Sequence, residues 1–167
     1  LGCLGYVACM KEVSEQAVAL GVRFDRVVCA TGSGGTHAGT ALGARLFLPG
    51  ARVTGVEVDT DPFEIIVPKL MRGAAELLGL DMEIKNEDVE LTPMWGEGYA
   101  IPSKEGNDAM KLMARNEGII LDPVYTGKTF AGLLKLNAEG AFDGEKNILF
   151  IHTGGAGGLF APDWEKE

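Results

Sequence analysis

The stretch Thr31-Gly32-Ser33-Gly34-Gly35-Thr36-His37-Ala38-Gly39-Thr40 decides the fold of this chain. It follows the apolar run Val27–Ala30, which is typical of a buried strand, and leads into Ala38–Leu48, whose apolar spacing predicts a helix. A glycine-rich turn between a strand and a helix start directs several backbone N–H groups at one point, together with the positive end of the helix dipole. The sequence therefore predicts a phosphate-sized anion site, with a tight turn that holds no ligand as the alternative.

The small residues of this turn suit a ligand in two ways. Gly32, Gly34 and Gly35 are expected to let the backbone adopt unusual dihedral angles and approach a ligand with no Cβ in the way. Ser33 and Thr36 add hydroxyl donors to the backbone N–H groups.

Two better-known phosphate loops fit this stretch less well. A P-loop ends in Gly-Lys-Ser/Thr, and no lysine lies between Lys11 and Lys69. The dinucleotide fingerprint G-x-G-x-x-G accommodates Gly32 and Gly34, but His37 occupies its third glycine position. This mismatch weakens the interpretation of the chain as a dinucleotide-dependent enzyme but does not exclude it.

The composition of the 167 residues bounds the class of protein. With 46% hydrophobic residues, the chain is long enough for a single domain, residues 1–167, with a sizeable core. The formal net charge of −9 argues against non-specific binding to nucleic acid or to an anionic membrane. The sequence contains no run of about 18 apolar residues, which a membrane span would need. Its three cysteines lack the spacing of a disulfide framework, which favours a location in the reducing cytoplasm. Because the chain opens at Leu1-Gly2 inside an ordered-looking segment, we expect it to be a piece of a longer protein.

Strand and helix patterns alternate along the chain. Strands are predicted at 25–30, 52–58, 89–91 and 147–152, and helices at 6–20, 38–48, 61–77, 103–117 and 126–137. As helix caps we expect Asp61, then Ser103, then Thr126 or Thr129. Such alternation is typical of an α/β fold with a largely parallel sheet flanked by helices. Ligands lie beyond the carboxyl ends of parallel strands, so residues 31–36 and 153–158, which each follow a strand, are expected at one edge.

Four separated motifs resemble one enzyme family. Residues 31–39 look like the phosphate cup of the pyridoxal-phosphate enzymes of the tryptophan-synthase β-subunit fold (fold type II). The D-cysteine desulfhydrase and 1-aminocyclopropane-1-carboxylate deaminase branch is similar at Gly98-Tyr99, Leu121-Asp122-Pro123-Val124-Tyr125-Thr126-Gly127-Lys128 and Ile151-His152-Thr153-Gly154-Gly155. Leu4-Gly5-Tyr6-Val7 also matches this branch, so the resemblance covers nearly the whole chain.

The resemblance implies the C-terminal part of the large cofactor-binding domain, with pyridoxal 5′-phosphate as cofactor and no metal ligand. It also implies that the N-terminal half, with the Schiff-base lysine, is absent from this chain; Lys128 does not match that lysine. The residues assigned to the cofactor are Thr31, Gly32, Ser33, Gly34, Gly35, Thr36, Thr126, Thr153 and Gly154. Thr153, with Thr126 as second choice, would meet the pyridine nitrogen, and Tyr99 and Tyr125 are the catalytic candidates on the substrate side.

Two threonines separate the activities of the branch. The resemblance implies glutamate and leucine at positions 126 and 153 in the deaminases but threonine at both in the desulfhydrases, as here. It therefore implies a lyase that converts D-cysteine to pyruvate, ammonia and sulfide by β-elimination. The alternatives are the deaminase and a non-catalytic module that binds a phosphorylated ligand. The implied partners are a small amino-acid substrate, the missing N-terminal segment and a second copy in a cytoplasmic homodimer.

Overall fold

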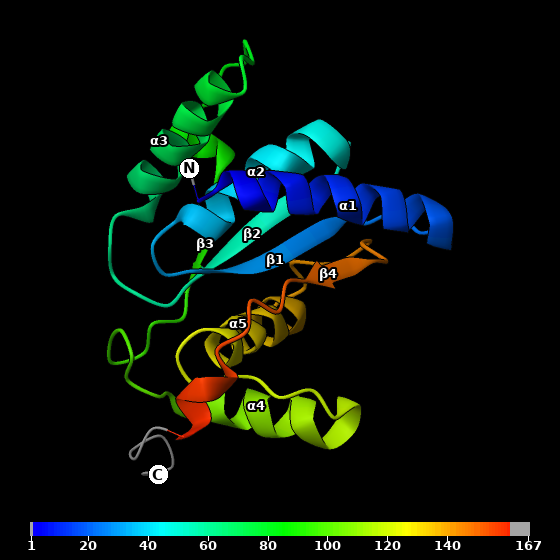
Figure 1. The fold of residues 1–167 in the computed structure, drawn as a ribbon. Helices are drawn as coiled ribbons and strands as arrows, with labels where there is room; N and C mark the ends of the chain where they lie inside the picture. The colour runs from blue at the N-terminus through cyan, green and yellow to red at the C-terminus, as the bar shows by residue number, and fades with distance from the viewer. Residues whose placement is uncertain (1, 161–167) are drawn as a thin grey trace.

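A four-stranded parallel sheet in the order β3-β2-β1-β4 lies at the centre of the fold (Figure 1). The computed structural model describes residues 2–160 and confirms the predicted parallel α/β architecture. The strands are β1 (Arg26–Thr31), β2 (Arg52–Glu57), β3 (Glu90–Pro93) and β4 (Ile148–Phe150). The helices are α1 (Leu4–Leu20), α2 (Gly35–Phe47), α3 (Phe63–Leu77), α4 (Lys104–Glu117) and α5 (Thr126–Ala138), with short 3-10 turns η1 (Asn86–Asp88) and η2 (Ala156–Phe160).

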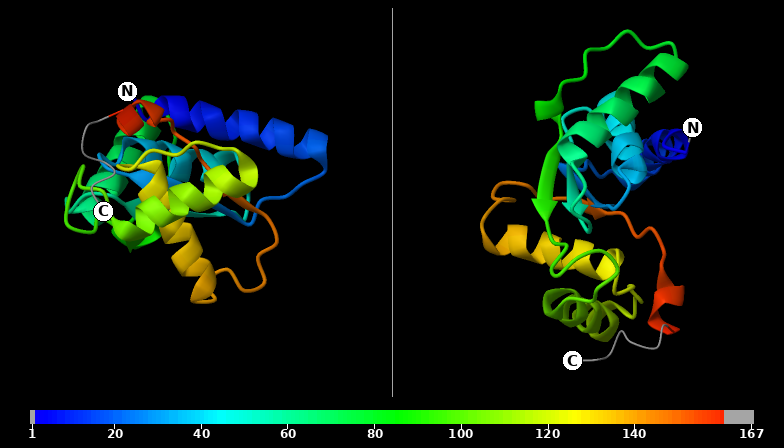
Figure 2. Two further views of the ribbon diagram at one scale, coloured as in Figure 1. Left: turned by 90° about the horizontal axis from the view of Figure 1, so that it is seen from below. Right: turned by 90° about the vertical axis from the view of Figure 1, so that its left-hand side faces the viewer.

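Helices cover both faces of the sheet. On one face α2 packs on β1 and β2, and α1 and α3 pack on α2 (Figures 1 and 2). On the other face α5 packs on the same two strands, and α4 packs on α5. None of the helices within residues 2–160 has the length and apolar character needed to span a bilayer.

The double cover explains why the middle of β1, Val27–Ala30, is continuously apolar. Val27 packs with Met10 and Ala44 on the α2 side, whereas Val28 packs with Val56 and Phe142 on the α5 side. All six residues of β1 are buried, as expected for a central parallel strand. The predicted buried strand is therefore confirmed, with its end one residue later than expected.

The cap predictions for three helices are partly correct and partly wrong. Ser103 caps α4 by accepting the N–H of Gly106 at 3.1 Å, and Gly118, in the left-handed conformation, ends that helix. The predicted Asp61 cap is wrong, because α3 begins at Phe63 after Pro62 and no side chain caps it. The Thr126 and Thr129 caps are also wrong, since Thr126 is already the first residue of α5.

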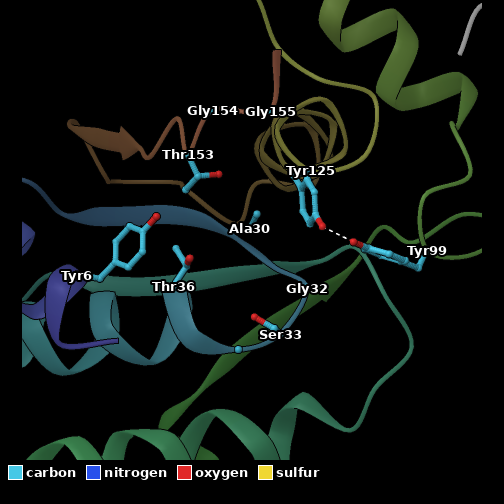
Figure 3. Close-up of a pocket in the computed structure, with 11 residues that line it drawn as sticks. Tyr6, Ala30, Gly32, Ser33, Thr36, Tyr99, Tyr125, Thr153, Gly154 and Gly155 are labelled. Atoms are coloured by element: carbon cyan, nitrogen blue, oxygen red, sulfur yellow. Dashed lines mark hydrogen bonds between the residues drawn. The ribbon is translucent and has the colours of Figure 1, made fainter. Parts of the chain in front are cut away.

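Close packing of α1 on α2 brings the first turn of α1 beside the glycine-rich turn. A Cβ on Gly39 of α2 would lie only 2.6 Å from the Cβ of Tyr6, so the absence of a side chain there allows the approach. Tyr6 is thereby carried to the carboxyl edge of the sheet, where the two glycine-rich loops meet (Figure 3).

Candidate functional site

A cavity of about 360 Å³ lies at the carboxyl edge of the sheet, beyond the end of β1 (Figure 3). It is bordered by the turn after β1, the loop after β4 and the start of α5, so the predicted meeting of the two glycine-rich loops is confirmed. Of the residues assigned to the site from sequence, the lining contains Gly32, Ser33, Gly34, Thr36, Tyr99, Tyr125, Thr153 and Gly154. Tyr6, Ala30 and Gly155 complete it.

Three residues assigned to the cofactor lie outside this lining. Thr31 is buried at the end of β1, Gly35 is the first residue of α2, and Thr126 is buried at the start of α5. Their direct contact with a cofactor stays a prediction. Thr31 and Thr126 are nevertheless buried directly next to lining residues, Gly32 and Tyr125, and support them.

The turn after β1 presents an uncapped helix start to the cavity. Gly34 is the N-cap of α2 and has φ +80°, a left-handed conformation that favours glycine. No side chain caps this helix, and the first N–H groups of an α-helix have no acceptor within it. The side chains of Ser33 and Thr36 lie at the cavity beside them (Figure 3). The arrangement, with the positive helix end, suits an anion.

The role of Gly34 differs from the sequence-based expectation. A Cβ at this position would not stand in the path of a ligand in the cavity, because it would point at α3, 3.0 Å from Cγ2 of Ile66. The idea that Gly34 clears the approach of the ligand is therefore wrong. Glycine is needed here for the positive φ and for the close approach of the turn to α3.

A buried polar pair supports the turn from below. The Thr31 hydroxyl and Nδ1 of His37 are 3.1 Å apart, and both residues are fully buried. Burial lowers the pKa of His37 to about 4, so its imidazole is neutral at physiological pH. His37 lies outside the cavity lining, so its role is to support the turn rather than to contact a ligand.

His37 makes the stability of the protein pH-dependent in a predictable direction. The unfolded imidazole binds a proton below pH 6.5 and the folded one only below about pH 4, so stability is present above pH 6.5 and is lost as the pH falls through this window. We expect wild type to lose about 2–3 kcal/mol more unfolding free energy between pH 7.5 and 4.5 than His37→Gln. Urea titrations measure this difference. His152→Gln is the control, and parallel curves for wild type and His37→Gln would contradict the assignment.

Two tyrosines face each other across the mouth of the cavity. The hydroxyls of Tyr99 and Tyr125 are hydrogen-bonded, and the rings meet edge to face with centroids 6.0 Å apart (Figure 3). The hydrogen bond to Tyr99, followed by burial, raises the pKa of Tyr125 to about 12. Tyr125 therefore keeps its phenolic proton at neutral pH. A Cβ on Gly32 would lie 3.1 Å from the Tyr125 ring, so glycine at that position lets the ring approach the turn.

Asp122 sets the start of α5 and was not singled out from sequence. Its Oδ2 accepts the N–H groups of Val124 and Tyr125 at 2.9 and 2.8 Å, and its Oδ1 accepts the N–H and the hydroxyl of Thr126, both at 2.7 Å. The carboxylate is buried and lies at the positive end of the helix. An aspartate followed by proline shortly before an apolar helical pattern is the signal that could have revealed this cap.

The loop after β4 and the first turn of α1 close the remaining side. The Thr153 side chain projects from the loop into the cavity, and the Tyr6 ring lies below it (Figure 3). Nδ1 of His152 accepts the N–H of Gly154 at 3.1 Å, and its Nε2 lies 2.8 Å from the Ile120 carbonyl oxygen. His152 thus shapes the loop. Tyr6 was not predicted as a lining residue, since its contact depends on how α1 packs.

Known proteins are similar to this chain in sequence and in fold. The family model described as pyridoxal-phosphate dependent enzyme matches residues 1–154. The D-cysteine desulfhydrase of Serratia proteamaculans (strain 568) is 41% identical and that of Yersinia pestis (strain Pestoides F) 45% identical, each over 96% of this chain and 49% of the relative. The chain therefore spans about half the length of these curated relatives.

A solved structure agrees with the sequence relatives. The crystal structure of an ACC deaminase homologue superposes with a TM-score of 0.83 at 40% identity, covering 95% of this chain and 47% of that protein. The parallel sheet, the two glycine-rich loops at its carboxyl edge and the family match over most of the sequence agree with one another. The chain belongs to the pyridoxal-phosphate dependent enzyme family.

Proposed function

We propose that the chain is the C-terminal half of a lyase that converts D-cysteine and water to pyruvate, ammonia and hydrogen sulfide. The observation that carries this proposal is the cavity, in which a helix start, a threonine and a tyrosine pair face one another (Figure 3). D-cysteine desulfhydrases 41–45% identical to nearly all of the chain support the choice of substrate.

The turn after β1 fits the phosphate group of pyridoxal phosphate. The N-cap of α2 is a glycine whose lack of a side chain leaves the helix start uncapped, so an anion can take the place of a capping oxygen. Ser33 and Thr36 add hydroxyl groups at the cavity. Hydrogen bonds of this charge-assisted kind contribute roughly 1.5–3 kcal/mol each.

Thr153 suits the ring nitrogen of the cofactor. When bound, pyridoxal phosphate supplies an electron sink for negative charge at Cα of the substrate. A threonine hydroxyl donates a hydrogen bond to a nitrogen that carries no proton, whereas a carboxylate would hold that nitrogen protonated. Thr153 therefore favours rapid loss of a good leaving group over a long-lived carbanion.

The tyrosine pair is placed for work on the substrate. Tyr125 holds its proton at neutral pH because the hydrogen bond to Tyr99 and burial raise the pKa of its phenol. We propose that the two phenols bind the substrate carboxylate or thiol end and move a proton at the phenolic oxygens. The half-exposed ring of Tyr99 leaves room for a small amino acid at the mouth of the cavity.

The deaminase remains the second candidate, because the ACC deaminase homologue resembles the chain closely in structure. Threonine at positions 126 and 153 favours the desulfhydrase. We further propose that the protein works as a homodimer in a reducing cytoplasm, which suits the free thiols of Cys3, Cys9 and Cys29.

The test uses the full-length protein, of which we propose this chain to be the C-terminal half. With D-cysteine we expect sulfide and pyruvate, and with 1-aminocyclopropane-1-carboxylate we expect little 2-oxobutanoate. Retention of pyridoxal phosphate without either product would favour the non-catalytic binding module. Faster formation of 2-oxobutanoate than of sulfide would favour the deaminase.

Thr153→Leu tests the role of the loop after β4. Removing the hydroxyl is expected to lower turnover of D-cysteine by roughly tenfold or more, since one hydrogen bond to a reacting group is lost. Some ring opening of aminocyclopropane carboxylate should appear. Thr60→Leu, at an exposed position, is the control. Unchanged turnover would show that Thr153 does not act on the cofactor ring. Thr126→Glu is a poorer probe, because its carboxylate would lie against Asp122.

A further inference from the structure

Lys128 is a fully buried lysine in the first turn of α5. Its Nζ donates to the carbonyl oxygen of Trp95 at 2.7 Å and to that of Gly98 at 2.9 Å. None of the ion pairs formed among residues 2–160 includes it. Burial lowers the pKa of this ammonium, and the nearby charge of Asp59 acts in the opposite direction.

Burying the Lys128 ammonium at this position costs free energy, which the two carbonyl groups offset. A buried ammonium loses its hydration, and a cation in the first turn of a helix faces the positive end of the helix dipole. The two carbonyl oxygens supply the hydrogen bonds that replace water. The lysine stem is covered by α4, since a Cβ on Gly106 would lie 3.4 Å from its Cγ.

The two carbonyl groups belong to the loop that carries Tyr99. The Trp95 oxygen also accepts the N–H of Gly98 at 3.2 Å, and the Gly98 oxygen accepts the N–H of Ile101 at 3.4 Å. Both turns of the loop thus close on oxygens that Lys128 holds. Ala100 has φ +59°, a conformation that is strained for a residue with a Cβ and needs support from its surroundings.

We propose that Lys128 is a positioning residue: through the carbonyl groups of Trp95 and Gly98 it fixes the loop that carries Tyr99, and so sets the place of that phenol at the cavity. The Tyr99 ring is about half exposed, so core packing does not hold it. Tyr125, the N-cap of α5, is bonded to its hydroxyl. Lys128, three residues further along, holds the carbonyl group of Gly98, the residue before Tyr99. The inference rests on the proposed function, in which Tyr99 acts on the substrate.

The first experiment measures the loop without using activity. Amide hydrogen exchange of the Gly98 and Ile101 N–H groups is compared in the full-length wild type, Lys128→Met and Lys128→Gln. We expect exchange in both variants to be roughly tenfold faster or more, because their acceptors lose the ammonium that holds them. Lys135→Met, an exposed lysine on the same helix, is the control. Unchanged exchange in the Lys128 variants would overturn the proposal.

The second experiment asks whether Lys128 acts through Tyr99. We expect Lys128→Met to lower kcat/KM for D-cysteine by roughly 10- to 100-fold with unchanged content of pyridoxal phosphate. In a Tyr99→Ala background the same substitution should lower kcat/KM little further, since both changes act on the same feature, the placement of the Tyr99 phenol. Additive losses would overturn the positioning role, as would failure of both Lys128 variants to fold where Lys135→Met folds. If the wild type releases no sulfide, only the proposed function is contradicted. The hydrogen-exchange experiment still tests whether Lys128 fixes the loop, because it does not use activity.

Discussion

Gly34→Val in the full-length protein is expected to lose pyridoxal phosphate during gel filtration, whereas wild type keeps it. Valine at φ +80° is strongly disfavoured, and its Cβ would press on Ile66 of α3 at 3.0 Å. The turn must therefore shift, and with it the N–H groups at the start of α2. Loss of two hydrogen bonds from these N–H groups to the phosphate, at roughly 1.5–3 kcal/mol each, lowers the affinity for pyridoxal phosphate by about two to four orders of magnitude.

The control for this substitution is Gly73→Val. Gly73 is an exposed residue of α3, and a Cβ at this position would point into open space. Absorbance of the bound cofactor per protomer after gel filtration gives the readout for both variants. Retention by Gly34→Val at the wild-type ratio would place the phosphate away from this turn.

Asp122→Ala is expected to be the most destabilising single substitution near the site. It leaves the part-buried N–H groups of Val124 and Tyr125 and the buried N–H group of Thr126 without their acceptor, and removes a negative charge from the start of α5. Unsatisfied buried donors cost roughly 1–3 kcal/mol each and partial relaxation recovers some of this, so we expect a loss of about 3–4 kcal/mol of unfolding free energy.

The substitution should also lower activity in the folded protein. Asp122 holds the backbone of Tyr125 and contacts Gly155 in the loop after β4, where a Cβ would overlap with its carboxyl group. Both sides of the cavity therefore lose their common support. Urea titration and sulfide release measure the two effects, with the exposed Asp81→Ala as control. A variant as stable as wild type would show that water replaces the carboxylate without cost.

The layered fold follows from local patterns in the sequence. The continuous apolar run of β1 reflects burial on both faces, and Ser103 and Gly118 mark the ends of α4 through bonds made within a few residues. The shared edge of the two glycine-rich loops follows from parallel topology, because both come after strands of one sheet.

The parts of the site that sequence could not provide depend on contacts between distant elements. Tyr6 reaches the cavity only because α1 packs closely on α2. The direction of a Cβ on Gly34 depends on where α3 lies, and the burial of Thr126 depends on the carboxylate of Asp122. Lys128 looks like an ordinary helix lysine until the loop at Trp95 is folded over it.

A crystal structure of the full-length protein with pyridoxal phosphate tests the central claim most directly. We predict the phosphate oxygens within hydrogen-bonding distance of the N–H groups at the start of α2 and of the Ser33 or Thr36 hydroxyl. The ring nitrogen should lie beside the Thr153 hydroxyl, and the substrate side should face Tyr99 and Tyr125. A cofactor bound with its phosphate elsewhere, and the turn at Gly34 facing only solvent, would contradict the account.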